Sequence, residues 1–114
     1  MKTHENKLVR DRIPELLTER GVPFEARTAS NAELSGLLLA KLDEEIAEYL
    51  AAADDLARAE ELADVLEVVV GLGGLCGADR GSLENLRARK AAERGAFDAH
   101  VVLISTGAAD QSGP

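Results

Sequence analysis

Residues 41–50, KLDEEIAEYL, place carboxylates on the apolar face of a predicted helix. At about 100° per residue, Leu38 and Leu42 lie within about 40° of each other on that face. Three acids lie inside this stripe or on its border instead of opposite it: Glu44, Glu45 and Glu48. Burying a carboxylate without a partner costs free energy, so the pattern predicts a positive charge near these acids.

The next predicted helix repeats the same conflict. Glu61 falls between Val68 and Leu72 on its apolar stripe, and Asp64 falls at the border. Acids three or four residues apart repel each other on a helix. A solvated acidic face is the simpler alternative, but the phase of the apolar residues weakens it. A hard divalent cation such as Mg²⁺ accepts oxygen ligands and bridges to phosphates, which favours a metal site.

The remaining pattern predicts a mainly α-helical chain. Pro14 suits the first turn of a short helix and Gly21 its end. Ser30 and Glu33 have the spacing of a capping box, and Ser82 is expected to cap the last helix. The predicted helices are 10–21, 31–52, 55–75 and 82–94, with small strands at 22–28 and 97–106 that could pair with each other.

Length and charge narrow the class of protein. The 114 residues predict one domain, 1–114, with a flexible tail at about 107–114. A net charge of −8 argues against nonspecific binding to nucleic acids or anionic membranes. The chain shows neither a long apolar run nor a signal-peptide pattern, which predicts a cytoplasmic protein. Its single cysteine, Cys76, is expected to be small, buried and unreactive.

The acidic motif and both ends of the chain resemble a known family. Glu44-Glu45-x-x-Glu48, twelve residues, and then Glu61-x-x-Asp64 are similar to the EExxE…ExxD signature of the all-α NTP pyrophosphatases, the MazG-like superfamily. KLVRDRIPELL (7–17) is similar to the start of a branch labelled phosphoribosyl-ATP pyrophosphohydrolase-like. KAAERGAFDAHVVL (90–103) is similar to the ending of that branch, with Ala96 in place of a glycine.

The resemblance implies a fold, an activity and a set of site residues. The fold would be an antiparallel helical bundle that forms a homo-oligomer, a dimer or a tetramer. The activity would be Mg²⁺-dependent hydrolysis of a nucleoside triphosphate to the monophosphate and pyrophosphate, a house-cleaning reaction in which Mn²⁺ could replace Mg²⁺. By motif position the metal ligands would be Glu44, Glu45, Glu48, Glu61 and Asp64, with Glu45 and Glu48 as catalytic candidates.

Negative charge of the phosphates that the metal does not offset requires basic side chains nearby. Basic residues cluster near the start and on the last helix despite the negative total, and Lys90 and Arg94 share a helical face. We predict phosphate contacts from Lys7, Arg10, Lys90 and Arg94, against the alternative of surface salt bridges on an acidic protein.

Three other functions fit the same residues. Phosphoribosyl-ATP hydrolysis in histidine biosynthesis uses the same signature with another substrate pocket. A noncatalytic module that senses a nucleotide or binds a partner would retain the fold. An acidic helical scaffold without a ligand would show no response to Mg²⁺.

Overall fold

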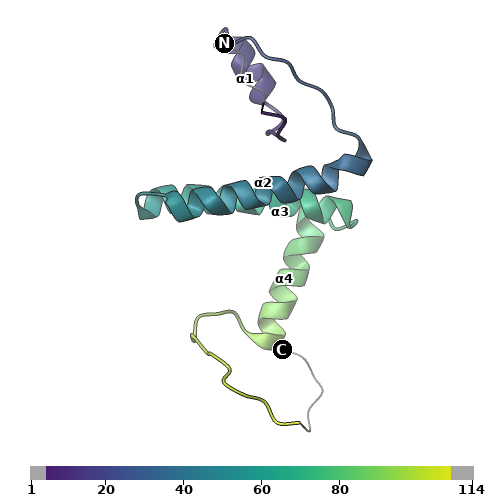
Figure 1. Ribbon diagram of the computed structural model, residues 1–114. Coiled ribbons are helices and arrows are strands. Elements are labelled where there is room, and N and C mark those ends of the chain that lie inside the picture. The colour runs from purple at the N-terminus through teal and green to yellow at the C-terminus, as the bar shows by residue number, and fades with distance from the viewer. Residues whose placement is uncertain (1–4, 109–114) are drawn as a thin grey trace.

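The computed structural model describes residues 5–108, and these contain four helices (Figure 1). They are α1 (Ile13–Glu19), α2 (Asn31–Ala51), α3 (Asp55–Leu75) and α4 (Arg80–Arg94). Helices α2 and α3 lie side by side as an antiparallel pair, joined by the short connection 52–54. In the view of Figure 1, α1 lies above this pair and α4 leads away below it. The predicted mainly α fold class is therefore confirmed.

Side-chain caps explain where the long helices begin. The hydroxyl of Ser30 accepts the backbone N–H of Glu33 at 3.4 Å, which confirms the predicted cap of α2. A carboxylate of Asp54 accepts the N–H of Ala57 at 2.8 Å, so Asp54 marks the break between α2 and α3.

The predicted cap of the last helix was wrong. Asp79 accepts the N–H of Ser82 at 2.8 Å, so α4 begins at Arg80, and Ser82 lies inside its first turn. Both Asp79 and Ser82 can cap a helix, and the earlier of the two does so here. Helix α1 agrees with its prediction, because Pro14 lies in its first turn and Gly21 follows it with φ +69°.

The two predicted strands were also wrong. Residues 22–28 and 97–106 contain no strand, and the described chain as a whole, 5–108, has none. Figure 1 places the two segments on opposite sides of the α2–α3 pair, so neither can offer the other a hydrogen-bonding edge. A strand without a neighbour is not stable in water. Phe97, the first residue of the second segment, is 96% exposed.

The packing between α2 and α3 is close but small. Leu38 and Val68 are the buried apolar side chains of the described residues. Leu38 reaches Gly71, where an added Cβ would lie 3.0 Å from its Cδ2 atom. At the end of α3, a Cβ on Gly73 would lie 2.8 Å from the carbonyl oxygen of Ala78, so only glycine fits this turn. The glycine-rich end of α3 thus allows close approach of its neighbours at Gly71 and Gly73.

One side of the α2–α3 pair carries acids and the other carries exposed apolar side chains. The N-terminal arm, residues 5–12, contacts acids of both helices, which defines the acidic side. The opposite stripe of each helix is apolar and exposed, as follows from helical periodicity. We name this stripe the apolar face; it comprises Leu39, Ile46 and Leu50 of α2 with Leu62, Leu66 and Val69 of α3.

The chain is extended for its length. Its radius of gyration is 18.9 Å, whereas a compact domain of this length has about 13 Å. Its accessible surface is 9714 Å², against about 6,000 Å² for an ordinary folded monomer of the same mass. A single copy therefore leaves much of its apolar surface in water.

Two further sequence predictions concern exposure. Cys76 was expected to be buried, but it is exposed, because it follows α3 at a turn that faces solvent. Among the described residues, none of the helices has both the length and the apolar character needed to cross a bilayer. The predicted flexible tail lies mostly outside the described residues.

Candidate metal centre between α2 and α3

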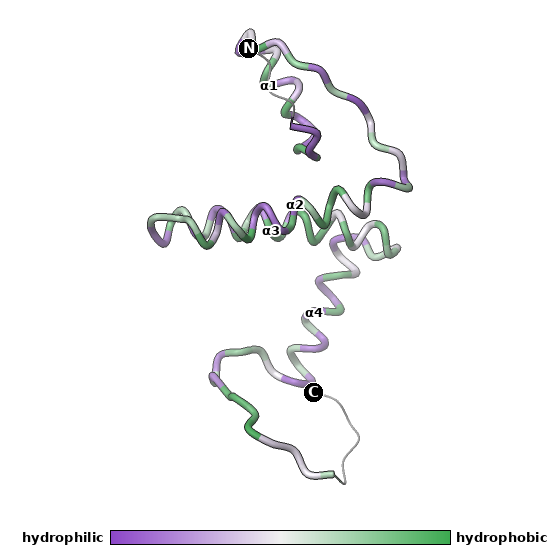
Figure 2. The backbone as a smooth tube through the Cα atoms, in the orientation of Figure 1, coloured by the Kyte–Doolittle hydropathy of each residue, from purple (hydrophilic) through white to green (hydrophobic). Residues whose placement is uncertain are grey.

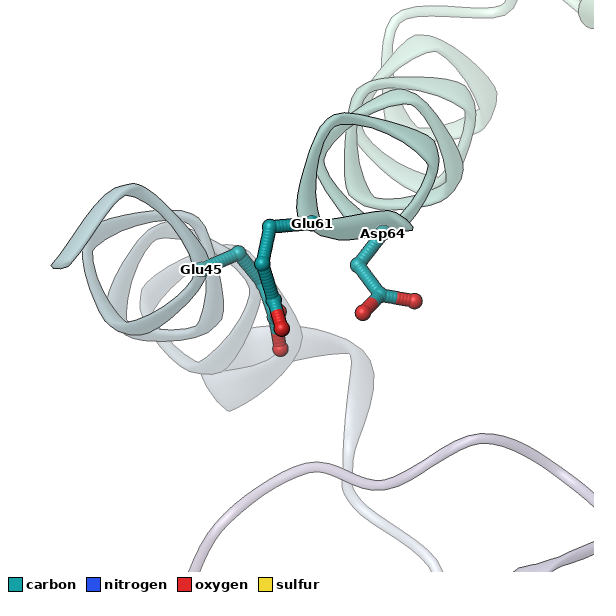
Figure 3. Close-up of side chains that lie close together, drawn as sticks. All are labelled: Glu45, Glu61 and Asp64. Atoms are coloured by element: carbon teal, nitrogen blue, oxygen red, sulfur yellow. The ribbon is translucent and has the colours of Figure 1, made fainter. Parts of the chain in front are cut away.

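Three carboxylates from the two long helices converge on one point. Glu45 comes from α2, and Glu61 and Asp64 come from successive turns of α3 (Figure 3). One oxygen of each residue lies within 4.8 Å of the other two. Glu45 is only 4% exposed, because its position on the apolar stripe turns it toward α3. The structure therefore brings together three of the five acids that the sequence singled out.

Two oxygens of the cluster lack a hydrogen-bond donor. Oε2 of Glu45 and Oε2 of Glu61 are inaccessible to solvent and accept no hydrogen bond. Buried polar atoms are nearly always paired, because an unpaired one carries its full desolvation cost. An oxygen-rich, donor-poor site of this kind fits a hard divalent cation.

The electrostatics of Glu61 show how crowded the site is. The pKa of Glu61 is raised from 4.5 to about 7, first by the close side-chain contact with Glu45 and then by desolvation. A contact and charge repulsion from Glu48 raise this pKa further. Without a cation the cluster therefore holds a proton that separate carboxylates would release.

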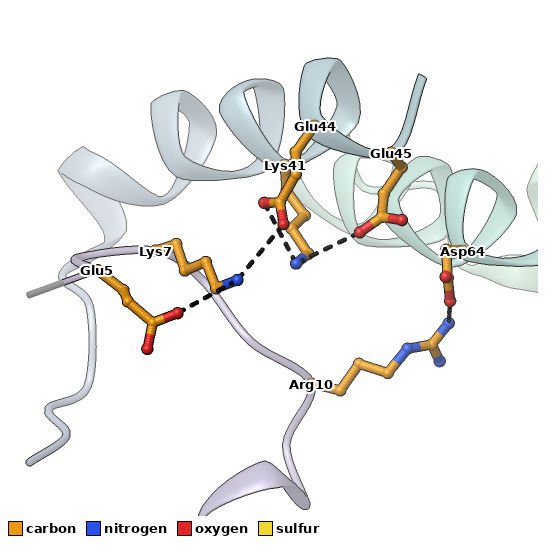
Figure 4. Close-up of polar contacts among 7 residues, drawn as sticks. All are labelled: Glu5, Lys7, Arg10, Lys41, Glu44, Glu45 and Asp64. Carbon is orange, nitrogen blue, oxygen red and sulfur yellow. Dashed lines mark hydrogen bonds and ion pairs between the residues drawn. The ribbon is translucent and has the colours of Figure 1, made fainter. Parts of the chain in front are cut away.

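Three basic side chains border the cluster, and Figure 4 shows their contacts. Lys41 lies 3.4 Å from Glu44 Oε2 and 3.3 Å from Glu45 Oε1. Lys7 of the N-terminal arm lies 3.5 Å from Glu44 Oε1, whose charge raises the pKa of Lys7. These ion pairs involve Glu44 and Oε1 of Glu45, at the edge of the cluster. They leave Oε2 of Glu45 and Oε2 of Glu61 unpaired.

Arg10 joins the arm to α3. Its Nη2 atom donates to Asp64 Oδ1 at 2.6 Å, and its Nη1 atom lies 3.9 Å from Glu67 Oε1. The same oxygen of Glu67 lies 3.5 Å from Arg80 at the start of α4. Glu67 thus helps to hold Arg10 beside the cluster.

The other two predicted ligands lie at the edge of the site. Glu44 is bound by Lys7 and Lys41, so in this arrangement it faces cations instead of the cluster. Glu48 is exposed but lies close enough to Glu61 to raise its pKa. Lys41 was not among the predicted site residues, although its spacing of three and four residues before Glu44 and Glu45 is the signal that predicts both contacts.

The predicted phosphate contacts divide into two groups. Lys7 and Arg10 lie beside the acids. Lys90 and Arg94 lie exposed near the end of α4, which leads away from the α2–α3 pair (Figure 1). Among residues 5–108, no ion pair joins Lys90 or Arg94 to the cluster. One chain thus brings two of the four cations to the acidic site.

The hollow beside the cluster is small. It has a volume of about 60 Å³ and is lined by the arm and α2, including Lys7, Lys41 and Glu44. Pockets for drug-sized ligands usually measure about 300–1,000 Å³. A wider hollow of about 420 Å³ lies at Thr18 and residues 21–24, and the carboxylates do not line it. In the described residues of one chain, the hollow next to the acids is therefore too small to enclose a nucleotide.

Comparisons with known proteins give one partial match. No family model matches the chain. The chain is similar to an uncharacterized protein of Mycolicibacterium smegmatis (strain ATCC 700084 / mc(2)155), at 54% identity over 46 residues. The match covers 40% of this chain and 47% of that protein, so the chain spans about half the length of the relative. No solved structure matches.

Proposed function

We propose that the protein is a Mg²⁺-dependent nucleotide pyrophosphohydrolase, which cleaves a nucleoside triphosphate into the monophosphate and pyrophosphate. The observation that carries this proposal is the convergence of Glu45, Glu61 and Asp64, with two of their oxygens buried and unpaired. The motif resemblance of the same acids to the all-α NTP pyrophosphatases supplies the reaction class.

Different acids of the chain would bind the cation and activate the attacking water. Glu45, Glu61 and Asp64 would hold the cation, with Glu44 and Glu48 completing its surroundings from the edge. A divalent ion bound there would offset triphosphate charge and lower the pKa of a water molecule. Glu48 is exposed beside Glu61, where a carboxylate can orient the attacking water and accept its proton.

The basic arm would meet the phosphates. Lys7 and Arg10 contact acids of the site through exposed side chains, so their cationic groups are within reach of a ligand in solvent. A triphosphate that approaches the acids requires such cations, because its own charge is repelled by the carboxylates. Lys90 and Arg94 remain proposed phosphate contacts, for which α4 must approach an acidic site in an assembly.

We further propose that the working form is a homo-oligomer. The accessible surface of one copy exceeds that of an ordinary folded monomer by roughly 3,700 Å². The hollow at the acids is too small for a nucleotide. A second copy would cover apolar surface and could supply walls for the substrate.

The test is pyrophosphate release from a panel of nucleoside triphosphates, with phosphoribosyl-ATP included, in the presence of Mg²⁺. We expect pyrophosphate and not phosphate as the product, and loss of turnover in Glu45→Gln and Asp64→Asn with unchanged helical circular dichroism. Asp43→Asn is the matched control, because it removes the same charge from an exposed position of α2. Full turnover by both site variants would contradict the proposal.

A further inference from the structure

We infer that the C-terminal segment, residues 97–104, docks on the apolar face of a second copy of this chain. The inference concerns how copies of the chain assemble. It is based on exposed apolar side chains, so it does not depend on the proposed hydrolysis reaction. It joins two apolar regions that one copy leaves separate.

The C-terminal segment reads FDAHVVLI and is almost wholly exposed. Five large apolar side chains in it are between 71% and 96% exposed: Phe97, Val101, Val102, Leu103 and Ile104. Figure 2 shows 101–104 as a continuous hydrophobic stretch that lies away from α2 and α3. An apolar run of this length in water indicates a docking segment whose receiving surface is elsewhere.

The apolar face offers a matching receiving surface. Leu39, Ile46 and Leu50 follow one stripe of α2, and Leu50 is 76% exposed. Leu62, Leu66 and Val69 follow one stripe of α3 beside it. Two adjacent helices present rows of apolar side chains, against which an extended apolar segment can pack.

The surface area fits a second copy. Each chain has roughly 3,700 Å² more accessible surface than a folded monomer of its mass. Obligate homodimers bury about 2,000–5,000 Å² in total. The excess accessible surface is therefore large enough for a dimer in which each C-terminal segment packs on the apolar face of the other copy.

The position of the segment favours exchange between copies. Helix α4 has 15 residues, which at about 1.5 Å per residue carry the segment about 22 Å from the end of α3. Gly95 ends α4 with φ +84°, and Figure 1 shows the following chain beyond the far end of α4. A segment that a helix holds at this distance can reach a neighbouring molecule while the rest of its own chain stays folded.

Charge favours the same geometry. The chain carries a net charge of −8, so two copies repel each other unless their acidic sides stay apart. The apolar face lies opposite the N-terminal arm and the acids. Docking there brings apolar surfaces together and keeps the carboxylate clusters of the two copies apart.

The first test is sedimentation velocity of the full chain at micromolar concentration. We expect an oligomer for the parent and a monomer for Val102→Asp, which puts a charge in the docking segment. Ser105→Asp is the matched control, because it adds the same charge just beyond the segment, and it should remain oligomeric. Circular dichroism should stay unchanged in both variants, since the segment does not contact the α2–α3 core.

The second test identifies the surfaces through disulfide formation. In a Cys76→Ser background, chains with Val102→Cys are mixed with chains with Ile46→Cys and oxidised. We expect a disulfide between the two kinds of chain, and much less when Glu25→Cys, on an exposed loop away from the face, replaces Ile46→Cys. A monomeric parent overturns the inference. So does an oligomer that Val102→Asp leaves intact, or a mixture in which Ile46→Cys gives no more disulfide with Val102→Cys than Glu25→Cys gives.

Discussion

Magnesium is expected to raise the melting temperature of the protein through Glu45, Glu61 and Asp64. Glu45 is the member to perturb, because it is 4% exposed and one of its oxygens is unpaired. Glu45→Gln keeps the size of the side chain and removes the charge. Lys41 retains Glu44 at 3.4 Å in this variant, so the loss of one ion pair does not strand the lysine.

The size of the effect follows from binding linkage. A ligand present at 100 times its Kd adds about 2.7 kcal/mol to the free energy of unfolding. A domain of this length unfolds with an entropy of roughly 0.24 kcal/mol per kelvin, so its Tm should rise by about 11 °C. If Glu45→Gln weakens binding by about 10–100-fold, a range known for groups that only support metal ligands, about 0.4–1.4 kcal/mol remains. The rise in Tm would then be about 2–6 °C.

The assay is thermal unfolding followed by circular dichroism during a MgCl₂ titration at constant ionic strength. Asp43→Asn serves as the control, because this exposed acid on α2 lies away from the cluster. It should melt with the full magnesium shift of the parent. Equal shifts for Glu45→Gln and Asp43→Asn would refute the assignment of Glu45, and no shift in the parent would refute the metal site.

Three further predictions concern the stability of the chain without added metal. The pKa of Glu61 is raised from 4.5 to about 7, so the folded state holds a proton that the unfolded state releases. The free energy of unfolding should therefore fall as pH rises from about 4.5 to about 7 and then level off. Urea unfolding across this range should show that slope, and Glu61→Gln should flatten it. Leu38→Ala should lower the free energy of unfolding by about 2 kcal/mol or more, because Leu38 is one of the two buried apolar side chains of the described residues; an unchanged urea midpoint would contradict this. Gly73→Ala should destabilise by about 1–3 kcal/mol, because its Cβ would meet the Ala78 carbonyl at 2.8 Å. Gly74→Ala meets nothing within 4 Å and should be neutral or stabilising by up to about 1 kcal/mol, so equal melting temperatures for the two glycine variants would contradict the steric argument.

The sequence predicted the parts of the molecule that depend on helical phase. Glu45 and Glu61 lie on apolar stripes, so helical phase predicts that each turns toward the interface between α2 and α3, where the structure brings them together. Ser30 and Glu33 lie next to an apolar repeat, and that local pattern was enough to locate the start of α2. These features need only a few residues of chain and no knowledge of the tertiary arrangement.

The features that were missed depend on choices that a local pattern leaves open. Asp79 and Ser82 are both good caps, and their order along the chain does not determine which one begins α4. The β-branched and apolar residues of 97–106 resemble a strand, but a strand also needs a partner edge, which the fold does not place there. The contact of Arg10 with Asp64 spans 54 positions and has no local signal.

The connection 52–54 has a consequence for the order in which the molecule assembles. So short a loop lets α2 and α3 meet early, because closing it costs little chain entropy. Arg10 must close a separation of 54 positions and should arrive later. The carboxylates therefore first approach each other with Lys41 as their nearby counter-charge, and dissolved cations should determine how fast this step proceeds. The same ions that the finished site is proposed to bind would then also assist the chain in reaching it.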